Sequence, residues 1–153
     1  MAVTLNASTS TGLVQSADTS GIITLQNNGT NAVTVDNGNL QFNSGYGSVA
    51  TAYGCRAWVN FNGTGTPAIR ASGNVSSITD DAVGSYTVNL TTAMPDTNFS
   101  ATLSSDTNAS GGLNAYTISI LSTSAISVYT YSVAGGGSGA YRDTANIFFA
   151  IFR

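Results

Sequence analysis

The chain has 153 residues, of which only 7% are charged, and its formal net charge is -3. All basic residues are arginine and all acidic residues are aspartate, because the sequence contains no lysine, glutamate or histidine. Four scattered arginines cannot build the basic face that binds nucleic acid through its phosphates, so we expect no nucleic-acid partner. The supply of tunable acids and bases is equally poor, and we expect no enzyme.

Cysteine content and hydropathy further limit the classes of protein to which the chain can belong. Cys55 has no partner for an intrachain disulfide, and we interpret it as a small buried apolar residue rather than a reactive thiol. No stretch approaches the roughly 20 apolar residues of a membrane span. The start, MAVTLNASTS, lacks the basic and apolar regions of a signal peptide. We therefore expect no membrane insertion.

The first 50 residues contain short apolar runs between turn signals. Runs at 22–25, 32–35 and 40–42 are separated by QNNGTN and DNGN, and Asn-Gly between such runs is the strongest short hairpin signal. We predict a strand for each run. Because so small a sheet is marginal alone, residues 1–50 should form a β-rich anchoring or trimerising segment. Its partner surface would be the rest of the chain or identical copies.

Residues 51–153 carry a denser strand pattern, with connectors rich in Gly, Asn, Asp and Ser. Many short strands separated by turns predict an all-β domain, an antiparallel β-sandwich or a barrel-like fold. We predict strands at 55–61, 68–72, 86–90, 99–104, 115–122, 125–133 and 145–152. The first two should anchor the core through Trp58, Phe61 and Ile69.

The last three predicted strands differ in their apolar patterns. AYTISIL alternates and predicts a half-buried strand, whereas AISVYTYSV has apolar or aromatic residues on both faces and indicates a second covered surface. ANIFFAIF is almost continuously apolar. It predicts either a central core strand or a strand at a subunit interface, because an exposed strand of this kind would aggregate.

The charged residues point to structural roles. Asp80, Asp81, Asp96, Asp106 and Asp143 all fall in predicted turns, where aspartate serves backbone hydrogen bonding. We expect Arg56 and Arg70 to pair with Asp80 or Asp81, or with a neighbouring subunit. The Asp80–Asp81 run lacks the alternating oxygen ligands of a calcium loop. GGGSG at 135–139 is followed by no lysine and no helix, so it is no phosphate loop. We predict no catalytic residue, metal or cofactor.

A longer motif carries a family resemblance. RAWVNFNGTGTPAIRASGNVSSITD followed by GSYTVNLTTAMPD, residues 56–96, resembles a module of tail-fibre and related virion proteins of tailed bacteriophages, especially marine and cyanobacterial ones. The leading GLVQSADTSGIITLQNNGTNAVTVD and the final FFAIFR resemble parts of the same fibres. The resemblance implies a structural protein of the virion, a homotrimer that contacts other virion proteins. It also implies exposure on the tail and attachment to a host-surface glycan or protein.

Two other functions stay open at this point. The chain could be a head or neck decoration with a purely structural role, since many such fibres are several hundred residues long. An enzyme that degrades host polysaccharide is the weakest reading, because the resemblance carries over no catalytic residues.

Host contact would require exposed groups on the long connectors, 104–114 and 134–144. Tyr141 and Arg142 would supply a stacking face and a charged fork, and Asn108 and Asn114 would supply amide hydrogen bonds. Against this, Arg142 and Asp143 could merely close a turn. The tyrosines at 116, 129, 131 and 141 could stack on sugars, although strand tyrosines more often fill a core or an interface.

Overall fold

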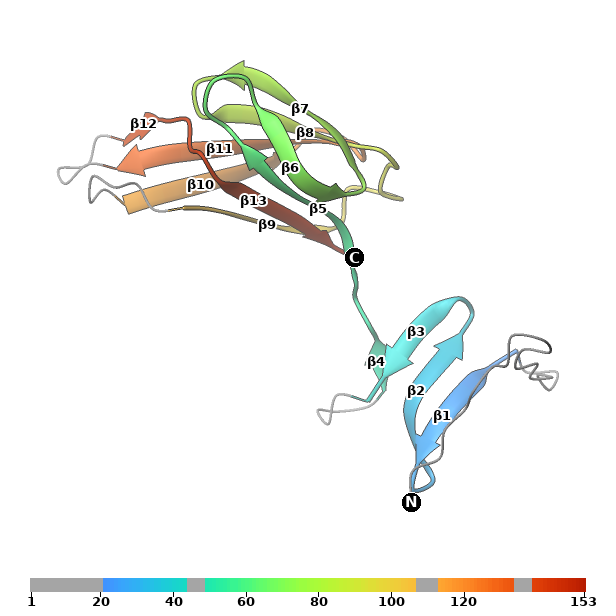
Figure 1. The fold of residues 1–153 in the computed structure, drawn as a ribbon. Helices are drawn as coiled ribbons and strands as arrows, with labels where there is room; N and C mark the ends of the chain where they lie inside the picture. Colours follow the sequence, from blue (N-terminus) through green and yellow to red (C-terminus); the bar gives the residue numbers. More distant parts are fainter. Residues whose placement is uncertain (1–20, 44–48, 107–112, 134–138) are drawn as a thin grey trace, which may run out of the picture. The chain divides into compact units, whose positions relative to one another are not determined.

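The computed structural model describes residues 21–43, 49–106, 113–133 and 139–153 (Figure 1). It divides into two compact units, residues 1–52 and 53–153. Across the described ranges all regular structure is β-strand, with antiparallel pairing throughout, so the prediction of an all-β fold is confirmed.

Unit 1, residues 1–52, contains a four-stranded meander in the order β1-β2-β3-β4. Its strands are β1 (Ile23–Asn27), β2 (Thr30–Asp36), β3 (Asn39–Phe42) and β4 (Ala50–Thr51). Asn28-Gly29 and Asn37-Gly38 form the first two hairpin turns, and all four residues have positive φ. This is the conformation that a two-residue type I′ turn needs and that Asn-Gly favours, so both hairpin signals are confirmed.

The register of unit 1 gathers its apolar side chains on one face. Between β1 and β2, Ile23 lies opposite Val35 and Leu25 opposite Val33. Between β2 and β3, Val35 lies opposite Leu40 and Val33 opposite Phe42. We call this set the apolar face of unit 1; it consists of Ile23, Leu25, Val33, Val35, Leu40 and Phe42. Apart from the half-buried Val33, these side chains are 39–53% exposed. A sheet normally buries such a face against a second layer, and the described part of unit 1 supplies none.

Unit 2, residues 53–153, is a sandwich of two antiparallel sheets (Figure 1). Sheet I has the order β10-β11-β8-β7, with β12 added beside β11, and sheet II has the order β6-β5-β13-β9. The strands of sheet I are β7 (Val75–Ala82), β8 (Ser85–Leu90), β10 (Leu113–Ile120), β11 (Ala125–Val133) and β12 (Gly139–Tyr141). Those of sheet II are β5 (Cys55–Asn62), β6 (Ala68–Gly73), β9 (Ser100–Ser105) and β13 (Ile147–Phe152).

The core of unit 2 lies between these sheets. Every second residue of the central strands points inward, and Phe61 packs edge-on against Tyr86 with ring centroids 5.4 Å apart. The most deeply buried side chains are Phe61, Val59, Tyr86, Val88, Ile126, Val128, Ile147 and Ile151. β13 lies between β5 and β9, so its apolar run belongs to a central core strand.

The sequence-based expectation missed β7. Residues 79–85 were expected to be a connector, but Asp80 and Asp81 lie within this strand. The strand is an edge of sheet I, where only Val75 is buried and Ile78 half-buried. An edge strand tolerates polar and charged residues on both faces, so its sequence lacks the apolar alternation that marks a half-buried strand.

The predicted core anchors were only partly right. Phe61 is fully buried, but Trp58 is 43% exposed and Ile69 is also exposed. β5 turns Ala57, Val59 and Phe61 inward, and alternation then directs Trp58 to the outer face of sheet II. The indole covers Gly73, since a Cβ there would lie 2.5 Å from Trp58 Nε1. Ile69 is exposed because β6 is an edge strand.

Two further expectations need correction. Cys55 is exposed rather than buried, because it begins β5 and the buried alternation of that strand starts only at Ala57. Arg70 donates a 2.6 Å hydrogen bond to the carbonyl oxygen of Ala145. In the described residues, neither Arg56 nor Arg70 forms an ion pair with Asp80 or Asp81; the ion pair that the structure shows joins Asp96 to Arg153. Pairing of these arginines with a neighbouring subunit stays a prediction.

Candidate binding surface

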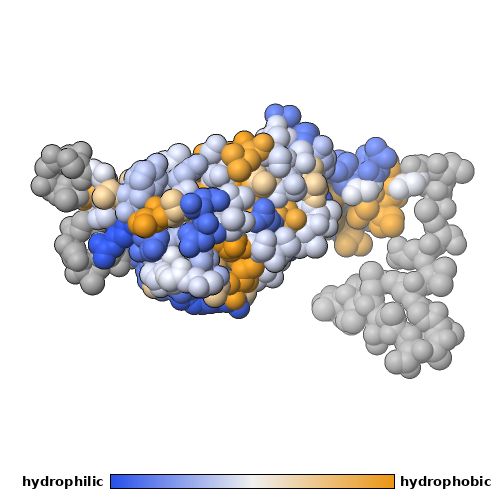
Figure 2. Space-filling model, turned by 90° about the horizontal axis from the view of Figure 1, so that it is seen from above, coloured by the Kyte–Doolittle hydropathy of each residue, from blue (hydrophilic) through white to orange (hydrophobic). Residues whose placement is uncertain are grey.

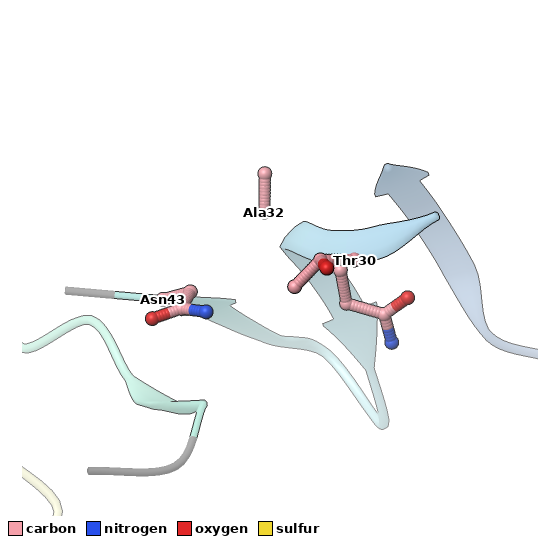
Figure 3. Close-up of a pocket in the computed structure, with 4 residues that line it drawn as sticks. Thr30, Ala32 and Asn43 are labelled. Carbon is pink, nitrogen blue, oxygen red and sulfur yellow. The ribbon is translucent and has the colours of Figure 1, made fainter. Parts of the chain in front are cut away.

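The described residues contain no group of three or more His, Cys, Asp or Glu side chains placed to hold a metal ion. Within the described part of the chain, no helix is long and apolar enough to cross a membrane. An open depression of about 340 Å³ on unit 1 is lined by Thr30, Asn31, Ala32 and Asn43 (Figure 3). These four residues are uncharged, so this hollow offers no acid–base chemistry.

Asp143 fixes the segment that follows β12. Its Oδ1 atom accepts a 2.7 Å hydrogen bond from the backbone N–H of Gly84 and a 2.8 Å hydrogen bond from the hydroxyl of Tyr86. The same hydroxyl lies 2.8 Å from the carbonyl oxygen of Gly63, just after β5. Burial, and next the hydrogen bond to Asp143, raise the pKa of Tyr86. Oδ1 of the Asp143 carboxylate thus hydrogen-bonds to both Gly84 and Tyr86 and holds this segment in place.

Two glycines leave the space that this arrangement needs. A Cβ on Gly63 would lie 2.6 Å from the Tyr86 hydroxyl, and a Cβ on Gly84 would lie 2.6 Å from the carbonyl oxygen of Thr130. Gly84 also has a φ of 63°, which glycine adopts without strain. Thr130 in turn accepts a hydrogen bond from the backbone N–H of Arg142 and donates its hydroxyl to the Arg142 carbonyl. The backbone at 142–143 is therefore held by the hydrogen bonds of Arg142 to Thr130 and by those of Asp143 to Gly84 and Tyr86.

Three tyrosines cluster on the outer face of sheet I, next to this fixed segment. Tyr129 and Tyr131 are two residues apart on β11, and Tyr131 lies opposite Tyr141 of β12. The ring centroids of Tyr131 and Tyr141 are 4.4 Å apart with planes 35° apart, and Tyr129 lies 6.1 Å from Tyr141. The hydroxyls of Tyr131 and Tyr141 form a hydrogen bond of 3.0 Å, and this bond is the main cause that raises the pKa of Tyr141. We call these three residues the tyrosine platform.

The rest of this outer face carries small polar side chains. Register places Thr79, Thr87, Ser127 and Ser119 in one row across the sheet. Asn89 donates to the hydroxyl oxygens of Ser77 and Thr79, and Thr87 donates to Asp81 at 2.7 Å. The face is therefore a field of hydroxyl and amide groups with the tyrosine platform at one end.

The outer face of sheet II is different. Trp58 lies opposite Ala150, which places it diagonal to Phe148 and Phe152, within reach of aromatic side chains. All three aromatic residues are 40–43% exposed, and Asn60 on the same face has a buried Oδ1 atom with no hydrogen-bond partner. We call Trp58, Phe148 and Phe152 the aromatic face of sheet II. In the space-filling view, apolar patches reach the surface among polar residues (Figure 2).

The structure describes the side chains of two of the four predicted contact residues, Tyr141 and Arg142. Tyr141 belongs to the tyrosine platform and is 50% exposed, whereas Arg142 is exposed and its backbone is bound to Thr130. Asn108 lies outside the described residues. Asn114 lies in β10 opposite Ser132, and its side chain is outside the description.

The predicted contact residues did not include Tyr129 and Tyr131. Their spacing of two residues on one strand indicates that both rings lie on the same face of the sheet, and this spacing is visible in the sequence. Tyr116 turns inward instead, and its hydroxyl lies 3.1 Å from that of Ser105. Comparison of the chain with models of protein families, with curated proteins and with solved structures found no match.

Proposed function

We propose that this chain is a structural protein of a bacteriophage virion, a tail-fibre-like homotrimer exposed on the particle that takes part in attachment to the host cell surface. The resemblance of residues 56–96 to tail-fibre modules supports the class of protein. The apolar face of unit 1 is the observation that supports assembly into a homotrimer. The tyrosine platform, in which Tyr141 is exposed and Tyr129 and Tyr131 are half-buried, lies on a rigid sandwich and supports a role in contact with an outside partner.

Assembly follows from the physics of a single sheet. The apolar face of unit 1 gathers six large side chains, most of them 39–53% exposed, on a sheet of short strands. Large contiguous apolar patches on a protein surface mark interaction sites. Identical copies bring identical faces, and three copies around one axis can bury all three faces in a closed arrangement. The aromatic face of sheet II would add a second contact, because its three aromatic side chains are 40–43% exposed.

Light scattering of the full chain tests assembly. The wild type should have three times the chain mass, and Leu40→Ser with Phe42→Ser should dissociate it. Gln41→Ser is the matched control, since Gln41 lies between these residues on the opposite face of β3. A monomeric wild type, or a double variant that stays trimeric, would contradict assembly through this face.

Cell binding tests attachment. Labelled wild-type protein should bind cells of a susceptible strain within a panel of marine bacteria and cyanobacteria, and should compete with phage infection. A trimer that binds no strain, but is located on the head or neck by antibody labelling of the particle, would instead be a structural decoration.

A further inference from the structure

We infer that the tyrosine platform, together with the polar outer face of sheet I, is a binding site for a neutral glycan chain. This inference rests on the proposed attachment function and names the chemical class of the surface ligand. Its basis is the combination of clustered aromatic rings, of which Tyr141 is exposed and Tyr129 and Tyr131 are half-buried, with uncharged hydrogen-bonding groups and a fixed backbone.

The rings of Tyr131 and Tyr141 are held in a fixed mutual arrangement, which leaves only the face of each ring that points away from the other for a ligand. The 4.4 Å contact of Tyr131 with Tyr141 and the hydrogen bond between their hydroxyls hold the two rings together. The backbones beneath them are paired in register, Tyr131 with Tyr141 and Ser132 with Ala140. A ligand therefore meets rings that lose little conformational entropy on binding.

The neighbours of the rings match a sugar better than a protein side chain. Tyr129 lies between Thr117 of β10 and Ser85 of β8, so hydroxyl groups flank the ring on both adjacent strands. Tyr131 lies opposite the exposed Ala115, whose small side chain leaves that side of the ring open. A pyranose ring presents apolar C–H groups on its faces and hydroxyl groups at its edge. Aromatic faces and hydroxyl or amide groups supply the complementary contacts.

The charges of the face favour a neutral ligand. None of the five strands of sheet I contains a basic residue, so an acidic sugar would find no countercharge on the sheet. Asp81 is the carboxylate of this outer face, and it accepts the hydroxyl hydrogen bond of Thr87. Arg142 follows β12 directly, which makes it the residue to test for an anionic ligand.

The test uses the full chain on an array of neutral oligosaccharides and of oligosaccharides that carry sialic or uronic acids. The wild type should bind neutral structures, and Tyr131→Ser or Tyr141→Ser should weaken that binding by about tenfold or more. Tyr141→Phe keeps the ring and should retain most of the affinity. Arg142→Gln and Tyr53→Ser should leave binding unchanged; Tyr53 is a matched control because it is 76% exposed and outside the platform.

A second readout does not depend on the folding of the serine variants. Titration of the wild type with a neutral oligosaccharide from the array should shift the ring NMR signals of Tyr129, Tyr131 and Tyr141, and not those of Tyr53. No binding on the array, binding only to acidic structures, or loss of binding in Arg142→Gln would overturn the inference, as would unshifted platform signals.

The two proposals fail in different ways. Host-cell binding that persists in the Tyr131→Ser and Tyr141→Ser variants would overturn the glycan platform and leave attachment standing. Neutral-glycan binding through the platform without cell binding in any strain would support the platform and count against attachment.

Discussion

The hydroxyl of Tyr86 donates a 2.8 Å hydrogen bond to Oδ1 of Asp143, which lies 57 residues further along the chain. Tyr86 projects from sheet I into the core, and its hydroxyl also reaches the carbonyl oxygen of Gly63 beside sheet II. One buried group thus joins the two sheets and the segment between β12 and β13. That segment follows Tyr141 directly, so the bond also anchors one end of the tyrosine platform.

Tyr86→Phe should lower the free energy of unfolding by about 1–3 kcal/mol, because it removes a buried hydroxyl that hydrogen-bonds to Asp143 and lies against the carbonyl oxygen of Gly63. Urea denaturation at neutral pH measures this loss. Tyr53→Phe is the control, since Tyr53 is exposed and should show no change. Equal midpoints for Tyr86→Phe and wild type would mean that water replaces the hydroxyl at no cost.

Alkaline pH should weaken the fold through Tyr86. Its folded-state pKa is raised, mainly by burial, while the unfolded tyrosine titrates near about 10. The contribution of Tyr86 is therefore complete below pH about 10 and is lost as pH rises through the higher folded-state value. Above pH about 10, melting temperatures should fall more steeply for wild type than for Tyr86→Phe. Parallel curves would assign the alkaline loss to other tyrosines.

Acid should weaken the contact between Asp96 and Arg153. The bidentate hydrogen bonds from the guanidinium hold the pKa of Asp96 below its usual value. The stabilisation is present above pH about 4 and disappears as pH falls through the lowered pKa. Asp96→Asn should thus be less stable than wild type at pH 7 and equal to it at very low pH. Added salt should narrow the difference at pH 7; a difference unchanged by pH would exclude an ionic origin.

Trp58 and Gly73 should behave as a coupled pair. Trp58→Ala should cost less than the roughly 3–5 kcal/mol of a buried tryptophan, because the indole is 43% exposed. Gly73→Ala should destabilise the wild type by about 1–3 kcal/mol, since its Cβ would meet the indole. In the Trp58→Ala background the same change should be nearly neutral. A double-mutant cycle in thermal unfolding measures the coupling, and additive effects would show that the indole moves aside freely.

Unit 2 should fold without unit 1. All members of its core cluster lie between Ala57 and Ile151, so a chain of residues 53–153 retains every one of them. Circular dichroism should show a cooperative transition close to that of unit 2 in the full chain, and light scattering should show weaker self-association. A fragment without a cooperative transition would mean that unit 2 depends on unit 1 for stability.

Local chemistry determined much of this protein. Asn-Gly pairs specify their own hairpin turns through positive φ, so the β1–β2 and β2–β3 turns were predictable. The bounds predicted for β11 agree with the structure, because turn residues flank a run rich in β-branched and aromatic residues. Alternation along β5 also assigns Ala57, Val59 and Phe61 to one face of the strand, and it assigns Trp58 to the opposite, outer face.

Tertiary structure decided what depends on residues far apart in the chain. Strand order made β7 an edge and so allowed its polar sequence, and it placed Tyr86 beside Asp143. The pairing of β11 with β12 brought Tyr141 onto Tyr131, while Tyr116, on the neighbouring strand, faced the core. A local pattern specifies whether a side chain points in or out of a sheet. Which strands become neighbours depends on the packing free energy of the whole domain, and no short stretch of sequence contains that quantity.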